Sequence, residues 1–260
     1  MQYSQCLRYG TSFFSMLVCS ICVVLLQKVN LKKQETAKNK LTYVQEEKQL
    51  ASIAEIQQRL PSFGYDNLLA DWNFLQFVQY FGDAEAREVT GYPLVTDYFK
   101  IAVDRDPHFT QAFLSFSAAN SLFAGQPKQT VKLINKVLET ASPDLPGYPF
   151  LLWTYKATDE ILFLGNIEAA KDSYEMAAEW ASIRNDGIGQ EMATRYRATA
   201  KFLASNPDSQ DAQIAAWTNV LSQAPDLKTQ QHAVNELKTL GVDVSIDDKG
   251  KINVTRQKKT

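Results

Sequence analysis

The chain has 260 residues, of which 45% are hydrophobic and 22% charged, so it can bury a sizeable core and is neither disordered nor wholly embedded in a membrane. Its 27 Lys and Arg nearly balance its 29 Asp and Glu, which argues against a nucleic-acid partner. The three cysteines, Cys6, Cys19 and Cys22, all lie near the amino terminus, so a disulfide framework is excluded for the rest of the chain.

An uncharged apolar run from Thr11 to Leu26 is the first distinct feature. With its neighbours it fills residues 9–29, roughly the 20 residues that cross a lipid bilayer as a helix. A cleaved signal peptide is the rival, but the sequence LLQKVNLKK that follows offers no small residues for cleavage. We therefore expect residues 1–30 to form a transmembrane anchor. Basic residues are more numerous after the run than before it, which favours a main domain on the cytoplasmic side.

Residues 31–62 are rich in Lys, Gln and Glu and form the predicted linker. Within them Leu50, Ile53, Ile56 and Leu60 have the spacing of one helix face. Pro61, which follows directly, is a helix-ending signal. The pattern predicts a polar, partly helical linker between the anchor and the main domain.

The main domain, residues 63–240, is a series of helical patterns separated by short breaks at Gly, Pro, Asn and Asp. The first helix is predicted to be capped by Asp66, and its apolar residues leave almost no polar face, so we expect neighbours to enclose it. Further helices are predicted over residues 83–89, 94–104, 109–124, 127–140, 150–164, 167–183, 189–204, 209–223 and 228–240. Residues 241–260 then alternate about Asp248-Lys249-Gly250, which predicts a β-hairpin followed by a basic tail.

One helix pair carries a repeat pattern. Gly165 follows its first helix, and Ala170, Tyr174 and Ala177 lie along its second. This set resembles the tetratricopeptide family, in which a turn glycine accepts a positive dihedral, small residues let helices approach closely and an aromatic fills the gap between units. The resemblance covers roughly residues 94–225, with one good unit flanked by degenerate ones. An unrelated helical bundle is the alternative.

The resemblance implies an all-α fold, a tetratricopeptide-like α-solenoid of antiparallel helix pairs that binds a protein partner along its inner helices. It implies a membrane-anchored scaffold or assembly factor for a membrane-associated complex. The alternative is a permanent structural subunit of a larger membrane complex. An enzyme ranks third, because no catalytic constellation converges.

Candidate chemical groups are isolated in the sequence. His108 and His232 lack a second ligand at metal-binding spacing, and each has the context of a surface or packing residue. Asp159 and Glu160 are adjacent, so they point in different directions on a helix and make a poor acid–base pair. We therefore expect no metal, no cofactor and no small-molecule substrate.

The predicted partner-binding residues lie on the first helices of successive pairs. Tyr155 and Asp159 are four residues apart and neighbours on one helix face. Gln111 and Ser115 have the same spacing in the preceding pair, and Arg195 takes the corresponding place in the following one. Tyr and Arg are common interface anchors, so these five residues form the predicted site. The alternative is that all five are solvated surface.

Overall fold

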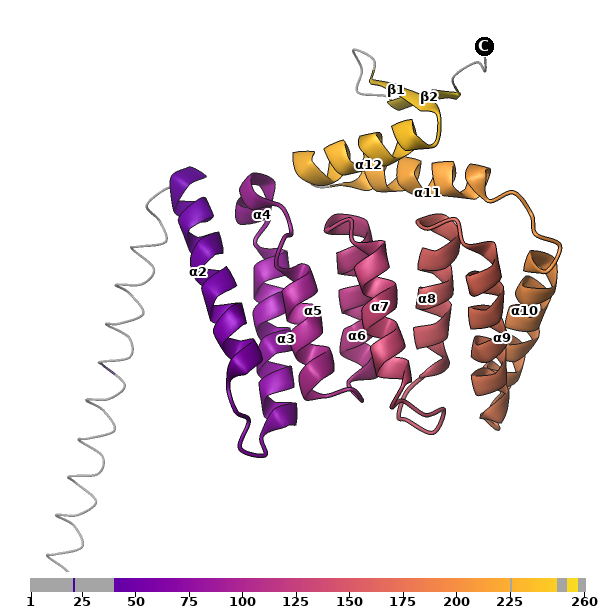
Figure 1. Cartoon of the computed structure of the whole chain (residues 1–260), viewed down its shortest axis with the longest axis horizontal. Helices are drawn as coiled ribbons and strands as arrows, with labels where there is room; N and C mark the ends of the chain where they lie inside the picture. The colour runs from indigo at the N-terminus through magenta and orange to yellow at the C-terminus, as the bar shows by residue number, and fades with distance from the viewer. Residues whose placement is uncertain (1–20, 22–39, 225, 247–251, 257–260) are drawn as a thin grey trace, which may run out of the picture. The chain divides into compact units, whose positions relative to one another are not determined.

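A computed structural model describes residue 21 and residues 40–224, 226–246 and 252–256 (Figure 1). The chain divides into two compact units, residues 1–46 and residues 47–260. The predicted anchor, residues 9–29, lies outside the described residues apart from Ile21. Among the residues that the structure does describe, no helix is long and apolar enough to cross a membrane.

The described chain is mostly helical and ends in two short strands, which confirms the predicted class of secondary structure. The helices are α2 (Lys40–Arg59), α3 (Asp66–Gly82), α4 (Ala84–Thr90), α5 (Val95–Arg105), α6 (Thr110–Ala118), the π-helix η1 (Ala119–Phe123), α7 (Pro127–Leu138), α8 (Phe150–Leu162), α9 (Ile167–Ile183), α10 (Gly187–Leu203), α11 (Gln210–Gln223) and α12 (Leu227–Thr239). Strands β1 (Val242–Ile246) and β2 (Ile252–Arg256) pair antiparallel, as the alternating pattern predicts.

Within the second unit, helices close in sequence pack on one another. The closest packing is between α9 and α10, between α8 and α9, and between α3 and α5. Figure 1 shows α3 and α5 to α10 standing side by side, while α11 and α12 lie across one end of the row. Since α11 also contacts α8, this crossing pair covers the end of the row at that helix.

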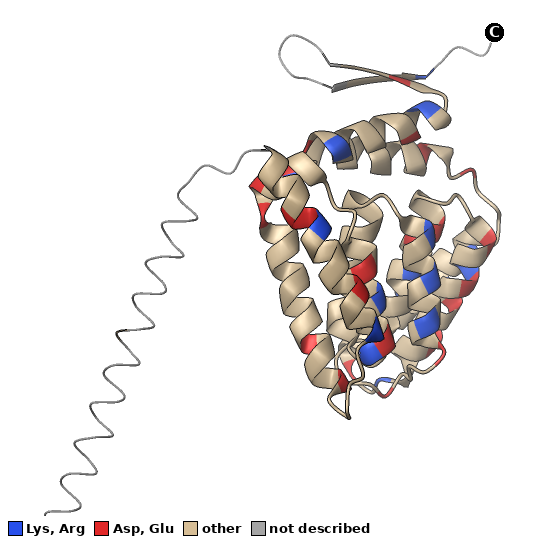
Figure 2. Cartoon of the chain, turned by 60° about the vertical axis from the view of Figure 1, so that its left-hand side comes forward, with Lys and Arg blue, Asp and Glu red and all other residues tan. Residues whose placement is uncertain are grey.

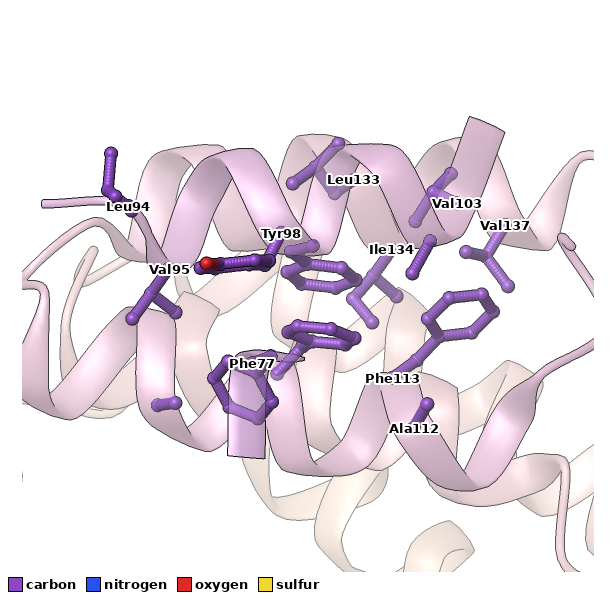
Figure 3. Packing of buried hydrophobic residues seen from close by; sticks show 14 of the residues in the cluster. Phe77, Leu94, Val95, Tyr98, Val103, Ala112, Phe113, Leu133, Ile134 and Val137 are labelled. Carbon is purple, nitrogen blue, oxygen red and sulfur yellow. The ribbon is translucent and has the colours of Figure 1, made fainter. Parts of the chain in front are cut away.

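The largest hydrophobic core joins α3, α5, α6 and α7 and is rich in aromatic rings. Phe99 and Phe116 stack with centroids 5.3 Å apart, and Phe77 lies 4.3 Å from Phe116. Figure 3 shows Phe113 of α6 and Ile134 of α7 converging in this core, and both side chains are fully buried. Phe, Tyr and Trp bury large areas each, so this cluster accounts for much of the packing of the amino-terminal half.

Helix α3 departs from the sequence prediction at both its start and its outer side. Asp66 is the first helical residue and caps nothing; its carboxylate instead accepts from Ser62 and pairs with Arg105. The expectation that neighbours enclose α3 is wrong, because Leu68 and Trp72 are 62% and 56% exposed. Packing against α5 buries only one side of the helix, and an apolar pattern alone does not show whether a second neighbour covers the other.

Helix α2 lies where the sequence predicts a linker, and from Glu47 onward it belongs to the second unit. Its polar side chains have specific partners: Glu47 accepts from Tyr80 and Arg87, and Gln57 donates to Gln76. A composition rich in Lys, Gln and Glu is typical of a solvated tether, but here some of those side chains hold the helix against the domain.

The small residues of the repeat pattern are buried where the pattern places them. Ala170 and Ala177 of α9 are both fully buried, and Gly165 has a φ of +64° in the turn between α8 and α9. The predicted helix over residues 109–124 differs in detail, because its last turn widens into η1.

Candidate partner-binding surface

The five predicted site residues do not form one exposed surface. Gln111, Ser115 and Arg195 are exposed and Tyr155 is half-buried, whereas Asp159 is only 5% exposed. Arg195 forms an ion pair with Glu191 one turn earlier on its own helix, at 2.6 Å. The assignment of Asp159 to an exposed binding face is therefore wrong.

Asp159 is turned inward by its position on α8. It lies two turns after Leu152, which is fully buried, so both residues share the face that packs on neighbouring helices. Tyr155 lies toward the edge of that face. Its spacing from Asp159 places the two residues close together but leaves open which face solvent reaches.

The Asp159 carboxylate accepts a hydrogen bond of 2.6 Å from the Ser121 hydroxyl of η1. Burial raises the pKa of Asp159 to about 7; the Ser121 hydrogen bond opposes this rise and the nearby Glu160 carboxylate adds to it. A carboxyl group with such a pKa can exchange a proton near neutral pH. Because Asp159 is buried between packed helices, we expect its protonation to change the stability of the fold.

A buried polar network extends from Ser121 across four elements. The Thr130 hydroxyl of α7 lies 2.8 Å from the Ser121 hydroxyl and accepts from the Asn120 amide at 3.0 Å. The Asn120 carbonyl oxygen in turn accepts from Thr96 of α5 at 2.6 Å. The Thr130 hydroxyl thus ties α7 to the widened turn, which an alanine at this position could not do.

Glu160 points away from Asp159 and has partners of its own. It pairs with Lys156 at 2.9 Å and accepts from Ser173 of α9 at 2.7 Å. The two adjacent carboxylates thus bond to different helices, as their positions on α8 predict. Both groups have the partners of structural residues, and buried charges with satisfied partners are tolerated in helix packing.

An apolar cavity of about 230 Å³ opens between η1, α8 and the crossing helices α11 and α12. Its walls include Leu122 and Phe123 of η1, Thr158 and Leu162 of α8, and Val220 of α11. On α8, Thr158 and Leu162 follow Tyr155 by three and seven residues, so they continue the Tyr155 face of that helix. The cavity is therefore the end of the surface that Tyr155 begins.

This cavity could not be predicted from the sequence because its far wall comes from α11, some 60 residues after α8 in the chain. No local pattern encodes the crossing of these two helices. The sequence does contain a partial signal. Thr158 and Leu162 continue the Tyr155 face toward the carboxyl-terminal end of α8, and the apolar Leu162 there indicates a further contact.

The described residues contain no group of three or more His, Cys, Asp and Glu side chains that could hold a metal ion. His232 packs edge-on against Trp217 with centroids 5.2 Å apart, in agreement with its interpretation as a packing residue. Its Nε2 atom is buried and has no hydrogen-bond partner among the described residues.

Comparison with protein-family models, curated proteins and solved structures finds no match to this chain. The helices, the half-buried Tyr155 face and the apolar cavity beside it are therefore the basis for inferring what the protein does.

Proposed function

We propose that this chain is a membrane-anchored, tetratricopeptide-like scaffold or assembly factor that holds a peptide segment of a protein partner. The segment lies along α6 and α8, past Gln111, Ser115 and Tyr155, and inserts one apolar side chain into the cavity beside Leu162 and Val220. The observation that carries this proposal is the apolar cavity at the end of the Tyr155 face.

The size and chemistry of the cavity support this occupant. A cavity of about 150 Å³ lined by apolar side chains holds a benzene molecule, so 230 Å³ accommodates one aromatic or branched side chain. Asn219 and Gln223 of α11 line the same cavity; Gln223 donates to the Asn219 carbonyl oxygen, and the Asn219 NH2 group can donate to a peptide backbone. An apolar pocket with a polar edge is the usual arrangement at a peptide-binding hot spot.

The helix pair α8–α9 supports the tetratricopeptide-like part of the proposal. Gly165 provides the positive dihedral at the turn, and Ala170 and Ala177 are buried where the two helices pack. In arrays of this kind the first helix of each pair lines the inner surface and receives the partner. That role falls to α6, α8 and α10.

The membrane part of the proposal rests on the uncharged run from Thr11 to Leu26. An anchor there holds the domain at the cytoplasmic face and limits its partners to proteins of the same membrane or near it. Deleting residues 1–27 is expected to move the protein from the membrane fraction to the soluble fraction.

Site-specific photocrosslinking in cells tests the cavity. A photoreactive amino acid at Gln111 should form a discrete adduct with the partner, and Val220→Trp should reduce that adduct several-fold by filling the cavity. Ala216→Leu is a milder filling of the same wall and should act in the same direction. Ile183→Trp, at an exposed residue of α9, is the matched control and should leave the adduct unchanged. Equal adduct yields in all variants with unchanged circular dichroism would contradict the proposal.

A further inference from the structure

The outer sides of α2 and α3, with the turn that joins them, expose a set of large apolar side chains. We call this set the α2–α3 outer face; its members are Ile53, Ile56 and Leu60 of α2, Phe63 of the turn, Tyr65, which directly precedes α3, and Leu68, Trp72 and Leu75 of α3. Their exposed fractions run from 44% at Ile53 to 84% at Phe63. Scattered apolar residues are normal on a protein surface, but a contiguous group of this size marks a contact.

The exposed apolar residues of α2 in this face form the α2 stripe, and Tyr65 with those of α3 forms the α3 stripe. Both stripes border the line along which the two helices meet. The Gln57 side chain donates to Gln76 across 2.7 Å, which fixes the sides on which α2 and α3 face each other. The next residue, Gln58, accepts from Lys100 of α5, so that side of α2 faces α5. Ile53 and Leu60 lie four residues before and three after Gln57, on the side away from α5.

The α3 residues are placed in the same way, by their spacing from Gln76. Trp72 precedes Gln76 by four residues, and Phe77 on the other side of Gln76 is buried in the core. Trp72, Leu68 and Leu75 therefore lie beyond Gln76 on the outer side, next to the α2 stripe. The apolar residues of the two helices therefore lie on either side of the Gln57–Gln76 contact.

The face carries little charge. The uncharged Gln49 continues the α2 stripe, positions 53, 56 and 60, one turn earlier, and the exposed Asp71, directly before Trp72 and one turn from Leu68 and Leu75, borders the α3 stripe, positions 65, 68, 72 and 75. The exposed ion pair of Arg59 with Glu55 lies at the margin of the α2 stripe. Figure 2 turns this side of the chain forward and shows charged residues separated by long uncharged stretches of helix. Trp and Tyr beside aliphatic residues, with a basic side chain at the margin, is the composition of a helix surface at a lipid headgroup boundary.

Phe63 supplies an independent observation. Its φ is +50°, a left-handed conformation that is strained for a bulky residue. The ring is 84% exposed, so packing within the described part of the chain does not compensate for this strain. Strained residues persist where they serve a function, and a protruding ring at the tip of the turn is placed to enter an apolar medium.

We propose that the α2–α3 outer face lies on the membrane, with both helices along its surface and Phe63 and Trp72 at the boundary of headgroups and acyl chains. The proposal rests on the anchoring of residues 9–29. From residue 29 to Lys40 the chain can span at most roughly 35 Å. Helix α2 has 20 residues and is about 30 Å long, so the whole face is within reach of the bilayer that holds the anchor.

The test uses the full chain reconstituted in phosphatidylcholine vesicles, with tryptophan fluorescence compared between plain and brominated acyl chains. Bromine quenches only rings within the bilayer boundary. Wild-type emission should fall with brominated lipid, and Trp72→Phe should remove most of that fall. Trp153→Phe, at a half-buried residue of α8, is the matched control and should keep it.

A second pair of variants tests the lipid contact while keeping the Trp72 fluorophore. Leu68→Glu should weaken the quenching of Trp72 several-fold, whereas Phe202→Glu, at a residue of α10 with the same 62% exposure, should leave it unchanged. Circular dichroism confirms that both variants fold.

Each other outcome overturns the inference. Vesicle association without quenching of Trp72 refutes the membrane contact and leaves the anchor and the cavity proposals standing. A dimer in detergent that Leu68→Glu converts to a monomer shows that a second copy covers the face. Failure of the full chain to enter vesicles refutes the anchor as well, while the crosslinking test of the cavity remains independent.

Discussion

The hydroxyl of Ser121 donates a 2.6 Å hydrogen bond to the carboxylate of Asp159, inside the packing of η1 on α8. This contact joins a widened helical turn to the helix that carries Tyr155 and the wall of the cavity. Because the carboxyl group is buried, its protonation state affects how firmly these two elements hold together.

Asp159 should make the stability of the protein depend on pH. Its pKa in the folded state is about 7, above the ordinary 3.8, so the folded protein binds this proton more tightly than the unfolded chain. The contribution of Asp159 to stability is therefore greatest below pH 4, falls as pH rises to about 7 and is constant above that. Asp159→Asn keeps an acceptor for Ser121 without the charge, so its melting temperature relative to wild type should rise across this window. A difference that does not change with pH would contradict the burial of a charged group here.

Glu47 is predicted to be essential for holding α2 on the domain. Its carboxylate accepts from Arg87, Tyr80 and Thr90, and Arg87 is only 3% exposed. Glu47→Ala leaves that guanidinium buried without its counter-ion, which should cost on the order of 3 kcal/mol in chemical unfolding. Glu55→Ala on the same helix removes only an exposed pair with Arg59 and should cost at most about 0.5 kcal/mol. Equal losses of unfolding free energy in the two variants would contradict the larger contribution assigned to the buried pair.

Two turn glycines should differ in their tolerance of alanine. Gly125 and Gly165 have φ of +65° and +64°, so alanine is strained at both by roughly 1 kcal/mol. At Gly125 the added methyl group would overlap Nε2 of His232, whose ring is held against Trp217. At Gly165 it meets the end of Gln213, which can move. Gly125→Ala should therefore lower the melting temperature more than Gly165→Ala; the reverse order would be inconsistent with this packing.

Close packing at Ala177 leaves no room for a larger side chain. Ala177 is fully buried against α8 and α10, in a cluster with Trp180, Ala193 and Tyr196. Ala177→Trp should cost ~1 to 3 kcal/mol or more, measured by thermal or urea unfolding. Ala198→Trp, at an exposed position of α10, is the control and should be nearly neutral. An unchanged melting temperature for both would tell against the tight packing of α9.

The helices and the hairpin could be predicted from the sequence because their signals are local. Apolar spacing, Pro127 at a helix start and the alternation about residues 248–250 each act over a few residues, and the structure agrees closely with the helices and strands that they predict. The buried alanines of α9 were also predictable, since small residues at helix spacing are needed wherever two helices approach closely.

The surface assignments were less predictable because exposure depends on distant neighbours. Asp159 looked like a partner of Tyr155 on an open face, but it is buried and bonds Ser121 of η1. Trp72 looked like core, but no helix of the described chain covers it. Helix α2 looked like a tether, because Glu47 and its partner Arg87 are 40 residues apart. In each case the deciding contact is long-range, and a single sequence does not reveal it.

Photocrosslinking from single positions tests most directly whether the protein holds a partner on the Tyr155 face. A photoreactive amino acid is placed in cells at Ser115 or Tyr155, and for comparison at Lys132, an exposed residue of α7 that does not line the cavity. The proposed function predicts the same partner adduct from Ser115 and Tyr155, reduced several-fold by Val220→Trp, and none from Lys132. Adducts of equal yield from all three positions, or from Lys132 alone, would contradict it.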